Sequence, residues 1–281
     1  MKEINQDQKE FWNNEKGKIW VALEKKIDAM LSPLGDEALK SLAPENGENI
    51  IDIGCGTATT SLKIADLVGD KGSVTGVDIS KPILECARQK AKENSVSNIE
   101  FILADAQNHK YLVNSYDAIF SRFGVMFFED PVAAFANLIK GLKSGGRLAF
   151  ICWAEPSVND WIETSTNVAS RFLELPPKAA PREPGPFAFE DPVYLRKILS
   201  DAGWKKITIE NYCTTNLVGK TIEEAADFLS RMGPMSIPFE NAEETVKIKV
   251  IDALKDCFSN YLTETGVEMN FNSWIVTANK A

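Results

Sequence analysis

Apolar residues recur along the chain at two spacings, one typical of amphipathic helices and one typical of buried strands. Short continuous apolar runs alternate with helix-like segments from Asn49 onward, and the alternation resumes near the carboxyl end after an interruption. The predicted strands are, in order, NIIDIG, SVTGVD, IEFILAD, YDAIFS, RLAFICW, WKKITIENY and NSWIVTANK. Strands that alternate with helices predict a mostly parallel sheet with helices on both faces. We therefore expect a doubly wound α/β fold with a seven-stranded sheet.

Segments that break this rhythm divide the chain. We expect a helical N-terminal arm at 1–45, an α/β core at 46–153, a Pro-rich lid insertion at 154–190, a continuation of the core at 191–212, a helical cap insertion at 213–270 and a final core strand at 271–281. Asp before Pro predicts helices that begin at Pro131 and Pro192. Thr221 and Glu224 have the spacing of a capping box at the start of a cap helix.

Charge and cysteine usage narrow the class of protein and its partners. A formal net charge of -9 disfavours nucleic acid or an anionic membrane surface as a partner. The five cysteines are scattered and form no CxxC pair, so we expect neither a disulfide framework nor a metal site. The first ten residues hold no apolar signal-type segment, and no apolar run approaches the roughly 18 residues that span a bilayer. We expect a cytoplasmic protein without membrane insertion; the oligomeric state is left open.

A glycine-containing turn carries the most specific signal for a ligand. In the run IIDIGCGTATT, Gly54 and Gly56 allow a tight strand-to-helix turn, and the helix start offers unpaired N–H groups. Asp78 ends the next strand, where a carboxylate accepts hydrogen bonds from ribose hydroxyls. Together these features indicate a nucleoside.

Two neighbouring residues favour one kind of nucleoside. Thr59 stands where the dinucleotide fingerprint has its third glycine, so NAD is disfavoured. Asp52 places a carboxylate just before the glycines, which favours a ligand with a cationic group on Coulombic grounds. S-adenosylmethionine carries both an ammonium and a sulfonium. Asp52 has an alternative role, in which it bonds loop amides and stiffens the turn.

The runs IIDIGCGTA, VTGVDIS, ILADAQN and YDAIFSRFGVMFFEDPVAAFANLIKGLKSGGRLAFICW resemble class I S-adenosylmethionine-dependent methyltransferases, most closely the small-molecule branch that includes ubiquinone and menaquinone biosynthesis methyltransferases. The resemblance is strong over about residues 46–153 and implies a Rossmann-like fold and methyl transfer from S-adenosylmethionine. It implies that the glycine loop contacts the methionine part, the acid after the second strand holds the ribose, and the acid after the third strand meets the adenine. The residues so assigned are Asp52, Gly54, Gly56, Asp78, Ile79, Asp105 and Ala106. Ala58 replaces the third glycine frequent in the family.

Three residues end the fourth strand, where open α/β sheets place ligand groups. We assign Ser121 to the cofactor and Phe123 to the acceptor, whereas Arg122 is either a catalytic candidate or the partner of a lid carboxylate. His109, the only histidine, is a candidate general base because histidine titrates near neutral pH. Its alternative is a place on the surface or the rim of the site.

Aromatic and methionine residues of the arm, of the end of the fifth strand and of the cap predict an apolar acceptor site. The candidates are Trp12, Trp20, Trp153, Met235 and Phe239, and they favour a small, apolar or aromatic molecule. A second small core that holds the cap together explains the same residues. Two other functions stay open: a protein that binds S-adenosylmethionine without transferring its methyl group, and a nicotinamide-dependent oxidoreductase.

Overall fold

The computed structural model describes residues 4–281 and, within them, a seven-stranded sheet of order β3-β2-β1-β4-β5-β7-β6. Its strands are β1 (Asn49–Ile53), β2 (Ser73–Asp78), β3 (Ile99–Leu103), β4 (Tyr116–Arg122), β5 (Leu142–Trp153), β6 (Lys205–Gly219) and β7 (Val267–Asn279). The first five strands pair in parallel, whereas β7 runs antiparallel to both β5 and β6. The expected mostly parallel, doubly wound sheet is confirmed.

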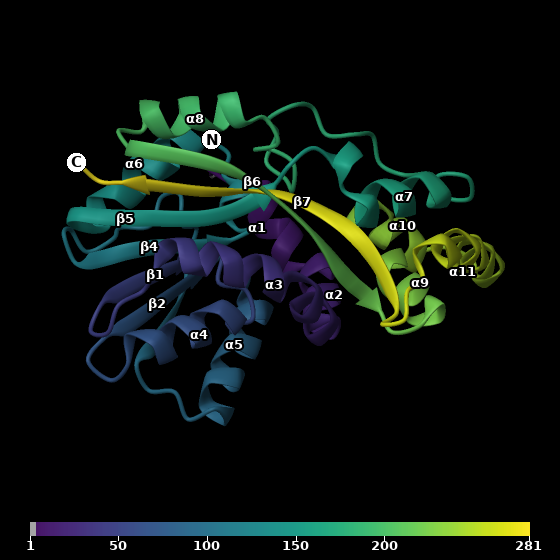
Figure 1. The fold of residues 1–281 in the computed structure, drawn as a ribbon, viewed down its shortest axis with the longest axis horizontal. Helices are drawn as coiled ribbons and strands as arrows, with labels where there is room; N and C mark the ends of the chain where they lie inside the picture. The colour runs from purple at the N-terminus through teal and green to yellow at the C-terminus, as the bar shows by residue number, and fades with distance from the viewer. Residues whose placement is uncertain (1–3) are drawn as a thin grey trace.

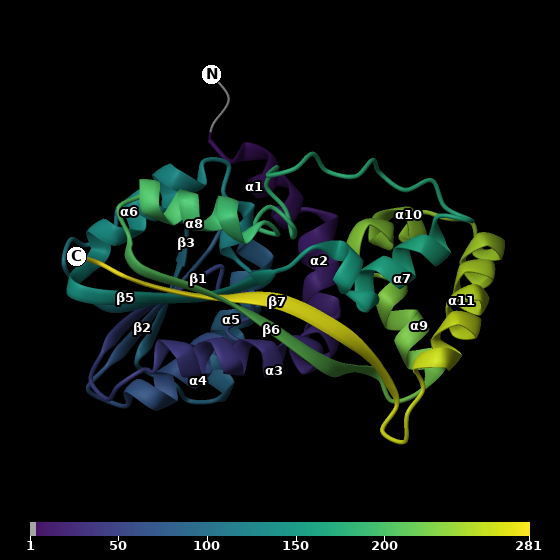
Figure 2. The same cartoon turned by 45° about the horizontal axis from the view of Figure 1, so that its top comes forward.

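Helices cover both faces of the sheet. Figure 2 shows α6 (Pro131–Gly141) and α8 (Pro192–Asp201) on one face, with α3 (Glu24–Leu42) and α4 (Thr59–Val68) on the other. The central strand β1 is buried from both sides, and its isoleucines at 50, 51 and 53 are at most 1% exposed. A continuous apolar run is what a strand covered on two faces requires. The helix α5 (Lys81–Glu93) follows β2 and contacts β2 and β3.

Helix starts follow the local signals in the sequence. Before α6, the side chain of Asp130 accepts a hydrogen bond from the backbone N–H of Ala133 at 3.0 Å, and before α8 Asp191 accepts one from Val193 at 2.8 Å. Thr221 caps α9 (Ile222–Ser230) by accepting from the N–H of Glu224 at 3.2 Å. These caps fix the start of each helix because they satisfy N–H groups that have no partner within the helix.

The last two strands are longer than the sequence pattern predicts. They pair from Lys205 opposite Asn279 to Gly219 opposite Val267, whereas β5 stops pairing with β7 at Ser273. We call the paired strands β6 and β7 the ribbon. Figure 1 shows the part of the ribbon that does not pair with β5 curving away from the sheet toward a group of helices. Residues 213–219 and 267–270, which we assigned to the helical cap, are therefore strand. Apolar residues such as Val218, Val267 and Met269 are interspersed with polar ones in these stretches, so no continuous apolar run marks them as strand.

The ribbon carries a helical cap. It consists of α7 (Asp160–Ala169), α9, α10 (Ser236–Glu240) and α11 (Glu244–Phe258), with the short 3-10 turn η3 (Gly233–Met235) before α10. The N-terminal segment folds as α1 (Gln6–Asn13), α2 (Glu15–Ala22) and α3, and Figure 2 shows α1 and α2 between the sheet and the cap. None of the helices within residues 4–281 combines the length and apolar composition needed to cross a membrane.

Candidate functional site

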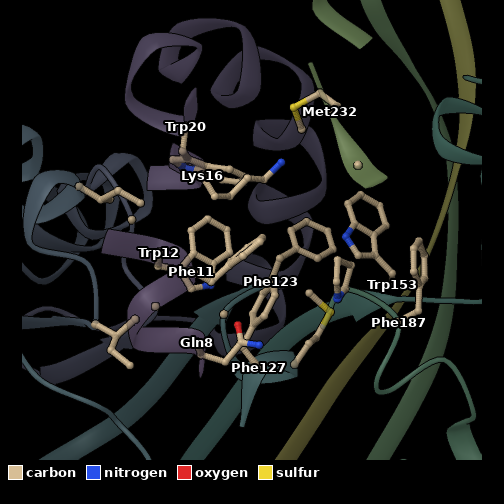
Figure 3. Close-up of a pocket in the computed structure, with 18 of the residues that line it drawn as sticks. Gln8, Phe11, Trp12, Lys16, Trp20, Phe123, Phe127, Trp153, Phe187 and Met232 are labelled. Atoms are coloured by element: carbon tan, nitrogen blue, oxygen red, sulfur yellow. The ribbon is translucent and has the colours of Figure 1, made fainter. Parts of the chain in front are cut away.

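A cavity of about 900 Å³ opens at the carboxyl ends of the parallel strands. Segments far apart in sequence enclose it: the strand ends and their loops, the helices α1 and α2, the irregular segment after α7, and the turn η3 with α10. Its volume is at the upper end of the range for small-molecule sites. Figure 3 shows aromatic side chains around much of its wall.

Two groups of lining residues differ in chemistry. One group lies at the ends of β1, β2 and β3, and we call it the floor. It consists of Asp52, Gly54, Gly56, Asp78, Ile79, Asp105 and Ala106. The other group comes from α1, α2 and the segments from Phe187 onward, and we call it the roof. It consists of Phe11, Trp12, Lys16, Trp20, Phe187, Met232, Ser236 and Ile237. The structure thus brings all seven residues assigned to the cofactor by resemblance into one cavity wall.

The two glycines of the floor serve different purposes. Gly54 has φ +64°, and a Cβ there would lie 2.7 Å from the Cα of Gly124, so the loop after β1 packs directly on the end of β4. Gly56 has φ +57°, and a Cβ there would meet no atom within 4 Å. The first glycine is required by packing and conformation, the second by conformation alone. Gly56 leaves the backbone open to the cavity. Ala58 also has a left-handed backbone, with φ +69°, which costs about 1 kcal/mol in a residue with a Cβ.

Asp78 joins the loop after β1 to the loop after β2. Its Oδ2 accepts the N–H of Gly56 and its Oδ1 accepts the N–H of Ser80, both at 2.9 Å. Each carboxylate oxygen has a second lone pair, so the side chain keeps capacity for hydroxyl donors in the cavity. Burial raises the pKa of Asp78, and the backbone N–H groups of Ser80, Gly56 and Ile79 oppose that rise.

Asp52 is the more deeply buried floor carboxyl, at 1% exposure. The hydroxyl of Ser61 donates to its Oδ2 at 2.6 Å. Burial raises the pKa of Asp52 from its ordinary 3.8 to about 7, so the group is partly protonated near neutral pH. A cation bound beside it would favour the ionised form.

Asp105 follows β3 and shapes its own turn. Its Oδ1 accepts from the N–H of Gln107 at 3.0 Å and from the side-chain amide of Asn5 at 3.3 Å. The Asn5 contact ties the start of the N-terminal arm to the loop after β3. The arm also reaches the loop after β2: the amide of Asn13 donates to the carbonyl of Ile79 at 3.0 Å. The arm therefore closes over the floor at two points.

Two candidate residues, Ser121 in β4 and His109 in the loop after β3, lie outside the cavity lining. Ser121 is fully buried beneath the floor; its hydroxyl donates to the carbonyl of Ile53 at 2.7 Å and accepts from the N–H of Gly124 at 3.2 Å. It supports the glycine loop and does not line the cavity. His109 packs edge-on against Tyr111 with ring centroids 4.9 Å apart, away from the cavity lining, and burial lowers its pKa. The structure thus does not place the proposed general base at the site.

Arg122 lines the cavity, but its guanidinium is engaged. It donates to Oδ1 of Asp28 in α3 at 2.7 Å, and both side chains are little exposed. Asp28 also accepts from Thr59 and lies 3.4 Å from the amine of Lys90. The partner of Arg122 is therefore a carboxylate of the N-terminal arm and not of the lid. This ion pair fixes α3 against the sheet.

The acceptor candidates divide into two sets. Trp12, Trp20, Phe123 and Trp153 line the cavity. Phe123 stacks on Trp153 with centroids 4.1 Å apart, and it does so from a backbone with φ +58°, which is unusual for a bulky residue.

Met235 and Phe239 do not line the cavity, which corrects our assignment. They lie four residues apart on η3 and α10, so both face the core of the cap, where they are 0% and 5% exposed. Their neighbours Met232, Ser236 and Ile237 line the cavity instead. A helix of five residues is too short for its sequence pattern to indicate which side chains face the cavity.

Sequence reasoning missed Lys16, a roof residue that is only 9% exposed. Its amine donates to Oγ of Ser236 at 3.0 Å, and burial lowers its pKa from 10.5 to about 8. One signal was present: Trp20 lies four residues after Lys16 in α2, so the two side chains share a helix face. Among residues 4–281 no three His, Cys, Asp or Glu side chains are placed to hold a metal ion.

The part of the chain that contains the floor is similar to known proteins. Residues 44–179 fit the family model described as a methyltransferase domain. The chain is 34% identical over 125 residues to a demethylmenaquinone methyltransferase of Listeria welshimeri, covering 44% of this chain and 53% of that protein. It is 34% identical over 119 residues to the aklanonic acid methyltransferase DauC of a Streptomyces species, covering 42% and 54%. The chain thus spans about half the length of these relatives.

A solved structure extends the likeness to the fold. A SAM-dependent methyltransferase from Aquifex aeolicus superposes with a TM-score of 0.54 at 17% identity, over 95% of this chain and 99% of that one. At this identity the match concerns the fold. Together these findings confirm the resemblance drawn from the sequence runs of the α/β core. All seven floor residues lie inside residues 44–179, and all eight roof residues lie outside.

Proposed function

We propose that this chain, whose residues 44–179 match a methyltransferase domain, transfers a methyl group from S-adenosylmethionine to a small, largely apolar or aromatic acceptor. One observation carries the proposal: the floor, with its carboxylates and open glycine loop, and the aromatic roof enclose a single cavity of about 900 Å³. That volume is sufficient for a nucleoside cofactor together with a second small molecule.

The floor fits S-adenosylmethionine. Gly56 leaves room for a ligand against the main chain, Asp78 has lone pairs for the ribose hydroxyls, and Asp52 offers a carboxylate to an ammonium. Asp105, after β3, would meet the adenine edge. When bound, the cofactor supplies a methyl group already activated on a positively charged sulfur.

The remaining work of the chain is positioning and exclusion of water. Orienting two reactants in one cavity removes much of the entropic barrier of a bimolecular reaction. The rings of Trp12, Trp20, Phe123 and Trp153 provide an apolar wall, and a dry cavity strengthens electrostatic interactions within it. His109 lies outside the lining, so we assign it no part in proton transfer.

The roof supports an apolar or aromatic acceptor. Trp12 contacts Phe11, Trp20 and Phe127 edge to face, with centroids 5.3–5.5 Å apart, and Phe123 continues the aromatic surface on the other side (Figure 3). The named substrates of the relatives, demethylmenaquinone and aklanonic acid, belong to those proteins. The acceptor of this chain depends on a roof that lies outside the matched domain.

We also propose a cytoplasmic location and no nucleic-acid partner. All five cysteines are unpaired, as in a reducing compartment. The net charge of -9 opposes binding to a polyanion.

The test is to incubate the purified protein with methyl-labelled S-adenosylmethionine and a host metabolite extract, and to identify the compound that gains the label. Wild type and Asp66→Ala, a change at an exposed carboxylate of α4, should label the same product. Asp78→Ala should label little. Tight binding of the cofactor without any labelled product would instead favour the alternative in which the chain binds the cofactor without turnover.

A further inference from the structure

Lys16 is a cationic group buried in an apolar part of the cavity. It lies in α2 and is 9% exposed, and the aromatic residues Trp12 and Trp20 flank it on the same arm. Figure 3 shows its amine pointing into the cavity, toward the side where Met232, Phe123 and Trp153 lie. Burying an ammonium among such side chains costs several kcal/mol unless a counter-charge is present.

The structure supplies no counter-charge to this amine from residues 4–281. Burial alone lowers the pKa of Lys16, with no carboxylate acting on it. The other buried cation of the cavity wall, Arg122, does have a carboxylate partner in Asp28. The two cations are therefore not equivalent: one is neutralised within the chain and the other is not.

The hydrogen bond to Ser236 does not neutralise the charge. The hydroxyl of Ser236 donates to the carbonyl of Gly233 at 2.9 Å, so its oxygen is free to accept from Lys16 at 3.0 Å. This bond holds the amine in place between α2 and α10. It uses one of three N–H donors and leaves two for a molecule in the cavity.

We propose that Lys16 recognises an anionic oxygen of the methyl acceptor, such as a carboxylate, phenolate or enolate on an apolar or aromatic body. The inference rests on the proposed function and narrows its substrate class to acidic molecules. An ion pair formed away from water is strong because the local dielectric is low. A neutral molecule of the same shape would leave the buried ammonium without a counter-charge and would bind less well.

The position of Lys16 favours the acceptor over the carboxylate of the cofactor. The floor carboxyls lie at the ends of β1, β2 and β3. Lys16 instead comes from α2, and its amine hydrogen-bonds to Ser236 of the cap. Its ligand therefore belongs to the roof side of the cavity, next to Phe123 and Trp153.

The experiment uses the full chain and two probes of matched shape, 2-naphthoate and the neutral 2-naphthamide. Their affinities are measured by calorimetry with and without S-adenosylhomocysteine. Wild type should bind the naphthoate at least tenfold more tightly than the amide, and Lys16→Met should reduce that preference to within twofold. Lys18→Met, a change at an exposed lysine that pairs with Glu15, should keep it.

Three outcomes overturn the proposal. If wild type shows no preference for the naphthoate, Lys16 does not recognise anions. If Ser236→Ala abolishes the preference as fully as Lys16→Met does, the lysine acts as a latch between arm and cap. If Lys16→Met weakens S-adenosylhomocysteine tenfold and spares the naphthoate, the lysine serves the cofactor. If wild type does not bind S-adenosylhomocysteine, the proposed function is wrong. The affinities for naphthoate and naphthamide without cofactor would still show whether Lys16 recognises an anion.

Discussion

The floor and the roof of the cavity handle charge in opposite ways. On the floor, each carboxylate is held by donors from the chain: Asp78 by two backbone N–H groups and Asp52 by the hydroxyl of Ser61. In the roof, the buried ammonium of Lys16 has the neutral hydroxyl of Ser236 as its partner. The floor is thus organised before any ligand binds, whereas the roof contains a positive charge that an anionic ligand would neutralise.

The two regions also differ in whether they belong to the part of the chain that is similar to known methyltransferases. The floor lies within residues 44–179, which match a methyltransferase domain, and the roof lies outside. A site that binds one common cofactor can be built on one recurring strand-end geometry. The acceptor wall combines Phe123 and Trp153 of the matched region with the roof residues of the arm and the later segments, so its chemistry must be established from this chain.

The largest expected effect is in the glycine loop of the floor. Gly54→Ala would place a Cβ 2.7 Å from the Cα of Gly124 in a left-handed conformation, and should lower the free energy of unfolding by about 3 kcal/mol or more. Gly56→Ala is the matched control because a Cβ there meets no neighbour; it should cost about 1 kcal/mol. Urea denaturation measures both, and equal losses would show that the contact with Gly124 does not constrain the loop.

The next effect concerns the cofactor. Asp78→Ala removes an acceptor of two charge-assisted hydrogen bonds to the ribose, each worth about 1.5 to 3 kcal/mol, so affinity for S-adenosylhomocysteine should fall by at least about 100-fold. Calorimetry checks this, with circular dichroism to show that the variant is folded and Asp66→Ala as the control. Unchanged affinity in folded Asp78→Ala would contradict the floor as the cofactor site.

A third effect should appear in the roof as a gain in stability. A pKa of about 8 in place of 10.5 for Lys16 corresponds to a cost of about 3 kcal/mol for folding with the protonated amine. The hydrogen bond to Ser236 offsets about 1 kcal/mol. Lys16→Met should therefore raise the free energy of unfolding by about 2 kcal/mol at pH 7.

The pH dependence of that gain tests its cause. Because the folded-state pKa is lowered, the cost is fully present below about pH 8 and disappears as the pH rises toward 10.5. The advantage of Lys16→Met over wild type in denaturation midpoints should shrink over that range. Lys18→Met should change stability by less than about 0.5 kcal/mol at either pH. A gain that did not vary with pH would indicate improved packing and not a buried charge.

The smallest effect is a pH dependence of cofactor binding on the floor. Asp52 has a pKa of about 7 in the free protein, and pairing with the cofactor's ammonium requires the ionised form. Its contribution is complete above pH 7 and is lost as the pH falls below 7, so affinity for S-adenosylhomocysteine should decrease about tenfold from pH 8 to pH 6. Asp52→Asn should show little change over the same range. A parallel decrease in Asp52→Asn would assign the titration to another group.

Local sequence signals were sufficient for the core and for most of the floor. The apolar run of β1, the glycines at 54 and 56, and Asp78 at the end of β2 each have a local physical cause. Parallel strands place their carboxyl ends at one edge of the sheet, so these residues had to meet once the sheet was recognised. Ser121, which we had assigned to the cofactor, is not a floor residue: the end of β4 was correctly located, but the side chain lies under the loop and donates to the carbonyl of Ile53.

The sequence by itself determined the alternation of strands and helices, the capped helix starts and the acidic glycine loop, because each depends on residues close together in the chain. Only the tertiary structure decided that Arg122 pairs with Asp28, that β6 and β7 extend as a ribbon to carry the cap, and that Met235 turns inward while Ser236 meets Lys16. Those outcomes depend on contacts between residues up to 220 positions apart. Such contacts form only when the arm, the sheet and the cap pack together, and no local periodicity records that packing.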